Sequence, residues 1–181
     1  MPADPATIWT IGHSTRTLEE FLGLLGEYRI EAIADVRRLP GSRRYPHFAS
    51  EALAKSLPVH GIAYEWMPEL GGRRKVQPGS PNTAWRNASF QGYADYTATA
   101  AFAEGLSELL KLAASKRTAM MCAEVLWWRF HRSIVSDVLK LRGIEVIHII
   151  DAKHTTVHPY TSPARIVDGR LSFAGEQGEL L

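Results

Sequence analysis

The first 150 positions of this 181-residue chain contain five largely apolar runs of five or six residues. A run that is apolar at successive positions is typical of a strand buried on both faces of a sheet. Between the runs, apolar residues recur at spacings of three and four, which indicates helices with one apolar face. The predicted strands are residues 8–13, 32–37, 62–67, 118–122 and 145–150.

Predicted helices connect these strands. The first follows a Ser14 or Thr15 cap, and the others occupy residues 50–57, residues 93–114 in one or two pieces, and residues 133–141. Gly143 is placed to end the last of these helices.

Buried strands that alternate with helices form parallel sheets with helices on both faces. We therefore predict an α/β fold, with a three-layer, mostly parallel, five-stranded Rossmann-like sheet and helices on both faces. The chain is expected to be one domain over residues 1–181, with its core at about residues 8–150. A hairpin on the Asp168-Gly169 turn is expected to extend this core at about residues 160–175.

Composition narrows the class of protein. A chain of 181 residues can bury a core without a disulfide or a metal ion. The single cysteine excludes an internal disulfide and a cysteine-based zinc cluster, and it fits a reducing compartment, so we expect a cytoplasmic protein. Residues 1–6 show no signal-peptide pattern, and no apolar run approaches the roughly 20 residues of a membrane-spanning helix. The net charge of +2 gives only weak support for nucleic-acid binding, although the arginines are clustered.

Polar and reactive residues follow each predicted strand. Open parallel sheets bind ligands at the carboxyl ends of their strands, so this asymmetry predicts a functional site at that edge. The residues at the strand ends are His13 and Ser14; Asp35, Arg37 and Arg38; Glu69; Cys122 and Glu124; and Asp151 and Lys153.

Four reactive groups lie within eleven residues after the fourth strand: Cys122, Glu124, His131 and Arg132. Cys122 is either a low-pKa thiolate or a small buried apolar residue. Glu124 is either a general acid or base or a carboxylate that stabilises a helix N-terminus, and the His-Arg pair is either functional or a solvated first turn. The phosphatase and rhodanese loop is excluded, because it needs an arginine where this chain has Trp128.

Two basic stretches mix cations with aromatic rings, which suits a phosphate, a nucleotide or a single strand. One holds Arg43, Arg44 and Tyr45, and the other is a Gly- and Pro-rich loop at residues 71–92. The alternative is a solvated basic loop. His154 and His158 have a zinc-like spacing, but Pro159 argues for a loop there. No dinucleotide fingerprint or phosphate-cradling loop is present, so we predict neither a cofactor nor a metal.

Five groups of residues also occur in the order and spacing of a known family. They are residues 10–14 (TIGHS); 35–38 (DVRR) with Pro40, Ser42, Arg43, Arg44, Pro46 and Phe48; 68–73 (PELGGR); 93–96 (YADY); and 121–124 (MCAE) with His131-Arg132 and a closing 146–149 (VIHI). Over roughly residues 8–150 the chain therefore resembles the DUF488 family, which is named only as a domain of unknown function. The resemblance implies an α/β fold and a polar cluster built from these positions, with no settled activity.

The resemblance also implies one departure from the family. Members usually carry a second cysteine directly before the His-Arg pair, and this chain has Phe130 there. A two-cysteine redox pair or metal clip is then not available. The neighbouring Trp127 and Trp128 indicate an apolar pocket wall or a contact surface.

These observations favour a small cytoplasmic hydrolase or transferase that acts on a phosphate-bearing or nucleotide-like substrate at the carboxyl edge of the sheet. The rival hypothesis is a non-catalytic nucleic-acid-binding module that uses the arginine and aromatic loops, and a third is a partner-docking domain built on Trp127 and Trp128. A small anionic or nucleotide-like ligand is expected, a membrane is not, and nucleic acid and a homodimer are left open. The candidate catalytic residues are Cys122, Glu124, His131 and Asp35, and the candidate substrate-binding residues are His13, Ser14, Arg37, Arg43, Arg44, Arg73, Tyr96 and Arg132.

Overall fold

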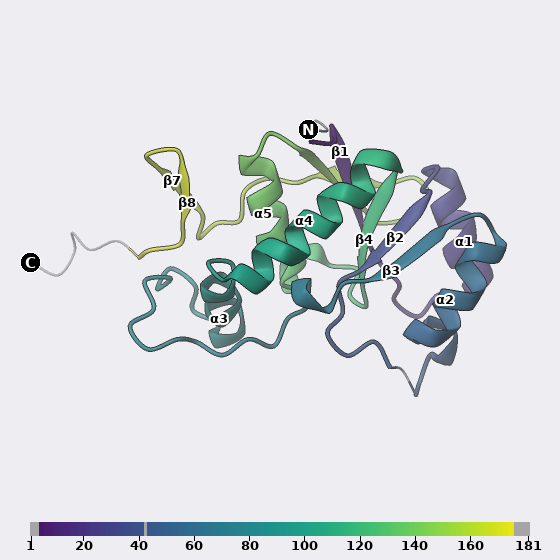
Figure 1. Ribbon diagram of the computed structural model, residues 1–181, viewed down its shortest axis with the longest axis horizontal. Coiled ribbons are helices and arrows are strands. Elements are labelled where there is room, and N and C mark those ends of the chain that lie inside the picture. The colour runs from purple at the N-terminus through teal and green to yellow at the C-terminus, as the bar shows by residue number, and fades with distance from the viewer. Residues whose placement is uncertain (1–3, 42, 176–181) are drawn as a thin grey trace, which may run out of the picture.

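The computed structural model describes residues 4–41 and 43–175. Its centre is a six-stranded sheet in the order β3-β2-β4-β1-β5-β6 (Figure 1). The first five strands in this order run parallel, which confirms the predicted α/β fold. The strands are β1 (Thr7–Gly12), β2 (Ala32–Asp35), β3 (Ala63–Trp66), β4 (Thr118–Cys122), β5 (Glu145–Ile149) and β6 (Thr155–Val157).

The sixth strand was not predicted. β6 is short, pairs antiparallel with β5, and is exposed at all three positions. An exposed strand buries no side chain, so it has no hydrophobic pattern that a sequence could reveal.

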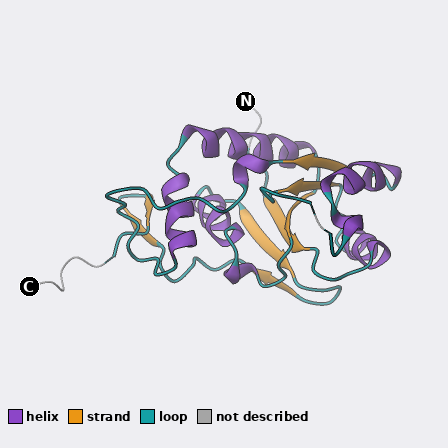
Figure 2. Cartoon of the chain, turned by 90° about the horizontal axis from the view of Figure 1, so that it is seen from below, coloured by secondary structure: helices purple, strands orange, loops and turns teal. Residues whose placement is uncertain are grey.

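Helices cover both faces of the sheet, as Figure 2 shows. On one face, α1 (Leu18–Glu27) and α2 (Ser50–Val59) pack over Ile11, Ile33 and Met121. On the other face lie α3 (Ala88–Tyr96), α4 (Ala100–Ser115) and α5 (Arg132–Leu141). Three short 3-10 turns complete the connections: η1 (Pro46–Phe48), η2 (Pro68–Leu70) and η3 (Trp127–Arg129).

Two helix starts differ from the prediction. The cap of α1 is Thr17 and not Ser14 or Thr15, because Thr17 and Glu20 form a reciprocal capping box. The helix after the basic loop begins at Ala88, where the Asn87 side chain accepts bonds from two backbone amides. It is a separate helix from α4, so the segment is in two pieces.

The predicted hairpin is confirmed. It consists of β7 (Arg165–Val167) and β8 (Arg170–Ser172), joined by Asp168 and Gly169, both with positive φ. In Figure 1 it stands apart from the main sheet, on the side of α5. Phe173, directly after it, is buried in the core and contacts Trp85.

The connections create an opening at the carboxyl edge of the sheet. The chain leaves β1 and β2 toward the face of α1 and α2, whereas it leaves β4 toward the face of α5. β4 lies between β1 and β2, so loops diverge on both of its sides, and such divergence is where open α/β sheets bind ligands. Within residues 4–41 and 43–175, no helix is long and apolar enough to cross a membrane.

Candidate functional site

A buried ion pair lies at the end of β2. Asp35 is fully buried and Arg37 is 8% exposed. The two side chains are joined at both ends, since Arg37 Nε donates to Asp35 Oδ1 at 2.8 Å and Arg37 Nη2 donates to Oδ2 at 2.7 Å. Burial pulls the pKa of Arg37 down, but its bonds to Asp35 outweigh burial and leave the pKa raised. The Arg37 guanidinium is therefore charged, and its two bonds to Asp35 fix its orientation.

Tyr64 completes the coordination of the Asp35 carboxylate. Its hydroxyl lies 2.5 Å from Asp35 Oδ2 and 2.8 Å from the Ser50 hydroxyl. Burial and the nearby negative charge of Asp35 raise the pKa of Tyr64 well above its ordinary value. The tyrosine is thus a permanent donor to the carboxylate, and it connects β3 and α2 to the end of β2.

His13 adjoins this ion pair from the end of β1. Its Nδ1 lies 2.8 Å from the Ser14 carbonyl oxygen, which can only accept, so Nδ1 carries the proton. Nε2 is then an acceptor for Arg37 Nη1 at 3.3 Å. Burial lowers the pKa of His13 to about 4, and the ring stacks on Phe48 at 4.3 Å. His13 is therefore a neutral acceptor that holds Arg37 in place.

A cavity of about 460 Å³ opens beside Arg37. Four of its lining residues are arginines (Arg37, Arg38, Arg73 and Arg129), and none of the described residues that line it is acidic. Arg73 has φ of 62°, a costly conformation for a residue other than glycine, at the rim of this cavity. The remaining lining residues are Leu39, Gly72, Asn87, Ser89, Phe90, Ala123, Phe130 and His131.

His131 forms part of the cavity wall just before α5. Its Nε2 lies 3.3 Å from the Val36 carbonyl oxygen and so donates to it, which leaves Nδ1 with a lone pair. Burial lowers the pKa of His131 to about 4, so the ring is neutral near pH 7. Gly72 lies against this ring.

Replacing Gly72 by alanine is expected to lower the free energy of unfolding by about 1 to 3 kcal/mol. A Cβ at this position would lie 2.8 Å from His131 Nδ1, closer than atoms in contact approach. Urea unfolding followed by circular dichroism measures the change. Gly41→Ala is the matched control, because a Cβ there meets nothing within 4 Å. Equal stability of the two variants would show that the turn does not touch His131.

Cys122 does not reach the cavity. It is fully buried, its thiol lies 3.5 Å from the Glu124 carbonyl oxygen, and its side chain faces the layer of α5. Burial raises the pKa of the thiol, against the opposing influence of the Arg132 cation. Cys122 is thus a neutral thiol at pH 7, in a wall behind the site.

Arg132 is fully buried beside that thiol. Its Nη2 donates to the Val125 carbonyl at 2.7 Å, while Nε and Nη1 have no hydrogen-bond partner among the described residues. Burial lowers the pKa of Arg132. The Glu124 carboxylate, half-buried nearby, makes no hydrogen bond or ion pair within the described part of the chain. Arg132 is therefore a buried cation with one hydrogen bond to the backbone, and it lies beside the Cys122 thiol and the Glu124 side chain.

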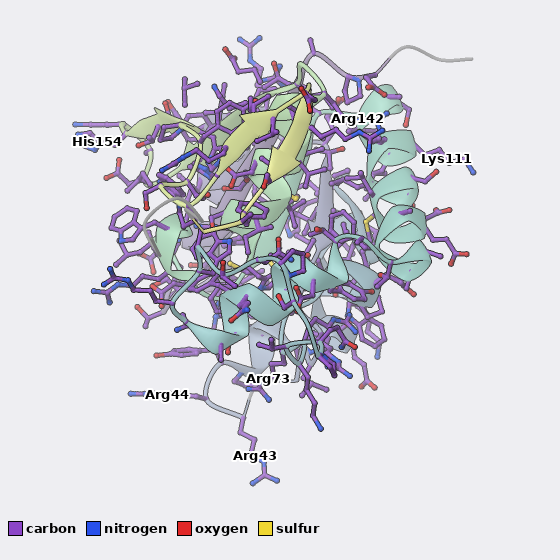
Figure 3. The ribbon with its side chains drawn as sticks, turned by 90° about the vertical axis from the view of Figure 1, so that its left-hand side faces the viewer. Arg43, Arg44, Arg73, Lys111, Arg142 and His154 are labelled. Atoms are coloured by element: carbon purple, nitrogen blue, oxygen red, sulfur yellow. The ribbon has the colours of Figure 1, made fainter. Side chains whose placement is uncertain are left out.

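The remaining predicted residues lie outside the cavity lining. Ser14 supplies its carbonyl to His13 and its amide to the Ala123 carbonyl, so it positions the end of β1. Arg43 and Arg44 are exposed, and Figure 3 shows them extending outward from their loop. Tyr96 lies beneath the Arg74 guanidinium, 3.8 Å from the ring centre, and orders the basic loop.

That basic loop is held by α3. The carboxylate of Asp95 accepts bonds from the Gln77 amide, the Ser80 hydroxyl and the Asn82 side chain. Asp95 and Tyr96 thereby fix the stretch that carries Arg73 to the cavity.

Only three of the twelve lining residues, Arg37, Arg73 and His131, were among the predicted site residues. The nine that were missed include Arg129, Phe90 and Phe130. Arg129 and Phe130 come directly before His131, so their position in the same short connection was a usable signal. Phe90 lies in the first turn of α3 and stacks on Trp85. Its position depends on where α3 begins, which the sequence analysis placed too late.

A second buried polar network lies behind Cys122. Thr10 Oγ1 is 2.6 Å from His148 Nδ1, His148 Nε2 is 2.8 Å from His158 Nδ1, and His158 Nε2 is 2.8 Å from Asp137 Oδ1. All four side chains are buried. Burial, followed by the proximity of His158, lowers the pKa of His148 to about 2. The network joins β1, β5 and α5 internally.

The tryptophan pair is split between core and surface. Trp127 stacks on His148 at 4.4 Å and is 9% exposed, so it covers this network. Trp128 is 53% exposed. His154 and His158 flank the short β6, where the chain is not helical. No group of three or more His, Cys, Asp or Glu side chains that could hold a metal occurs in residues 4–41 and 43–175.

Comparisons with known proteins agree with the resemblance seen in the sequence. Residues 17–139, more than half of the chain, match the family model described as a domain of unknown function, DUF488. His13 and Ser14 precede the matched segment, whereas Asp35, Cys122, Glu124 and His131 lie within it. No curated protein and no solved structure matches the chain. The chain belongs to the DUF488 family.

Proposed function

We propose that this protein binds a phosphate-bearing, nucleotide-like ligand in the cavity and acts on it as a small hydrolase or transferase. One observation carries the proposal: four arginines line a cavity of about 460 Å³, and no carboxylate lines it within residues 4–41 and 43–175. Guanidinium groups bind phosphate oxygens through paired N–H donors, and Phe90 and Phe130 offer apolar surface to the rest of such a ligand.

The buried ion pair has a supporting role in this proposal. Arg37 already uses Nε and Nη2 on Asp35 and the Phe48 carbonyl, so its orientation is fixed before the ligand arrives. A pre-oriented cation loses little side-chain entropy on binding. Arg73 and Arg129 are exposed at the rim and supply the contacts that form on binding.

His131 is the proposed general base. For hydrolysis, its Nδ1 takes a proton from water as the water oxygen attacks phosphorus, and that proton passes to the oxygen of the leaving group as the P–O bond breaks. The negative charge of a bound phosphate raises the pKa of His131 toward 7, because it stabilises the protonated, positively charged ring. Arg73 and Arg129 balance the charge on the phosphoryl oxygens.

The role of the arginines that line the cavity is tested by removing the charges of Arg73 and Arg129 at its rim. Arg73→Gln and Arg129→Gln are each expected to weaken binding of a nucleoside monophosphate about 5- to 50-fold, because each removes a charge-assisted contact. Isothermal titration calorimetry gives the dissociation constants.

The control is Lys111→Gln, which removes an equal charge from the exposed side of α4, away from Arg73 (Figure 3). It is expected to leave the affinity unchanged. If all three variants bind equally well, or if the wild-type protein binds neither nucleoside monophosphate nor pyrophosphate, the proposal fails.

A second candidate is a nucleic-acid-binding module that performs no chemistry. It is favoured by the position of Cys122, which is buried, protonated and outside the cavity lining, so no thiolate nucleophile faces a ligand there. In this case Cys122→Ser changes no measured property of binding, and affinity falls steeply with salt, because phosphate contacts release counterions. Turnover of any phosphate ester that depends on His131 would decide for the enzyme.

A further inference from the structure

A second hollow is lined by residues that directly follow Arg37, Arg38 and Leu39 in the chain. It is more open than the cavity and has a volume of about 740 Å³. The two depressions share one connection, since residues 37–39 line the cavity and Pro40, Gly41 and Arg43 line the hollow. Its other lining residues are Ala49, Ser50, Glu51 and Trp66.

Trp66 is a rigid aromatic surface in this hollow. It ends β3, the edge strand of the sheet, and is 48% exposed. Its indole Nε1 donates to the Arg37 carbonyl at 2.7 Å, so the only polar atom of the ring is already satisfied. The exposed part of the ring is therefore available for stacking, at a fixed position beside the residue that forms the cavity wall.

The hollow and the cavity share one buried hydrogen-bonded framework. Ser50 lines the hollow and is bonded to the Tyr64 hydroxyl, Tyr64 is bonded to Asp35, and Asp35 holds Arg37. This chain of contacts fixes the hollow relative to the cavity without any ligand. A ligand that spans both would meet two preformed surfaces.

The charges around the hollow suit a base inside it and phosphates outside it. Glu51 is its one acidic lining residue, and carboxylate oxygens accept from base amino groups while repelling phosphate. Arg43 and Arg44 extend from the rim into solvent, as Figure 3 shows, and Arg38 lies toward the cavity. Leu39, 67% exposed, lines the cavity and directly precedes Pro40, which lines the hollow.

We propose that the Trp66 hollow is a subsite for one unpaired base, so that the ligand of the cavity is a single-stranded nucleic acid of at least two nucleotides. The inference rests on the proposed phosphate-binding function of the cavity. One nucleotide occupies the cavity, the next base stacks on Trp66, and the connecting phosphate passes over the connection at residues 38–40. Stacking on an aromatic side chain and charge contacts with the backbone are how single strands are held without a sequence code.

The test is a series of ligands of increasing length, measured by isothermal titration calorimetry on the full chain at one salt concentration. The series is a nucleoside monophosphate, a dinucleotide, a pentanucleotide, and a dinucleotide in which one residue at a time is abasic, each as DNA and as RNA. The wild-type affinity is expected to rise at least tenfold from the monophosphate to the dinucleotide, and only slightly from there to the pentanucleotide. The abasic dinucleotides are expected to lose most of this gain.

Trp66→Ala is expected to remove the gain and to leave the affinity for the monophosphate unchanged. Trp66→Phe, which keeps a ring, is expected to retain most of it, and this variant separates stacking from loss of the bond to Arg37. The matched control is Trp128→Ala, since Trp128 is 53% exposed and lines neither depression.

The outcomes separate the two proposals. If the wild-type protein binds monophosphate and dinucleotide equally, or if Trp66→Ala keeps the full gain, the base subsite is refuted while the cavity function stands. If no member of the series binds, the cavity function fails, and the subsite fails with it.

Discussion

Replacing Asp35 by alanine is expected to lower the free energy of unfolding by about 3 to 5 kcal/mol at pH 7. The substitution leaves the Arg37 cation 8% exposed without its carboxylate, and only the Phe48 carbonyl and His13 remain as partners for the guanidinium. It also removes the acceptor of the Tyr64 hydroxyl. Urea unfolding followed by circular dichroism gives the loss directly.

Two further variants show whether the loss comes from an unpaired buried charge. Asp35→Ala combined with Arg37→Met is expected to recover part of the stability, because the cation is then absent as well. Asp151→Ala is the matched control, since Asp151 pairs with His154 at the surface with half of its side chain exposed, and its loss is expected to change the free energy of unfolding far less than the loss of Asp35. Asp35→Ala that costs no more than Asp151→Ala would contradict the proposed role of the pair.

The burial of each strand explains which strands the sequence could predict and which it could not. The strand at residues 118–122 was predicted at its observed bounds, because every residue from Thr118 to Cys122 is buried and the pattern has no competing period. The short β6 left no such trace, because its three side chains are exposed and only backbone bonds to β5 define it. Strands that bury side chains can be predicted from the hydrophobic pattern of the sequence, whereas strands held only by backbone hydrogen bonds cannot.

The site was predictable to a similar extent. The order of residues in the sequence shows that reactive side chains occur at the ends of the strands. The structure places His13 against Arg37, as expected for two residues at the carboxyl edge of one sheet. Which way each side chain points could not be read, because successive residues of a strand face opposite layers. Cys122 ends β4 on the side of α5 and is sealed, whereas Ala123, one position later, lines the cavity.

The burial of three histidines also makes the stability of the protein depend on pH. The pKa values of His13 and His131 are lowered to about 4, and that of His148 to about 2, in each case mainly by burial. In the unfolded chain these groups have the ordinary pKa of about 6.5. Below that pH the unfolded state binds more protons than the folded state, so stability falls as the pH falls.

The protein is therefore expected to lose stability steeply between about pH 6.5 and pH 4. Each buried neutral histidine contributes about 1.4 kcal/mol per pH unit in this range, and three of them bring the loss to on the order of 4 kcal/mol per pH unit. His148 extends the range below pH 4, because its folded pKa is lower than the other two. The measurement is urea unfolding at half-unit steps from pH 7.5 to pH 4.5.

Histidine variants show which groups cause the change of the unfolding free energy with pH. His13→Asn is expected to reduce the slope by about a third whatever it does to stability at pH 7, because one of the three titrating groups is gone. His60→Asn, at an exposed histidine, is expected to leave the slope unchanged. A slope that persists in full in His13→Asn would mean that His13 has the same pKa in the folded and the unfolded protein, which would contradict the lowering of its pKa by burial.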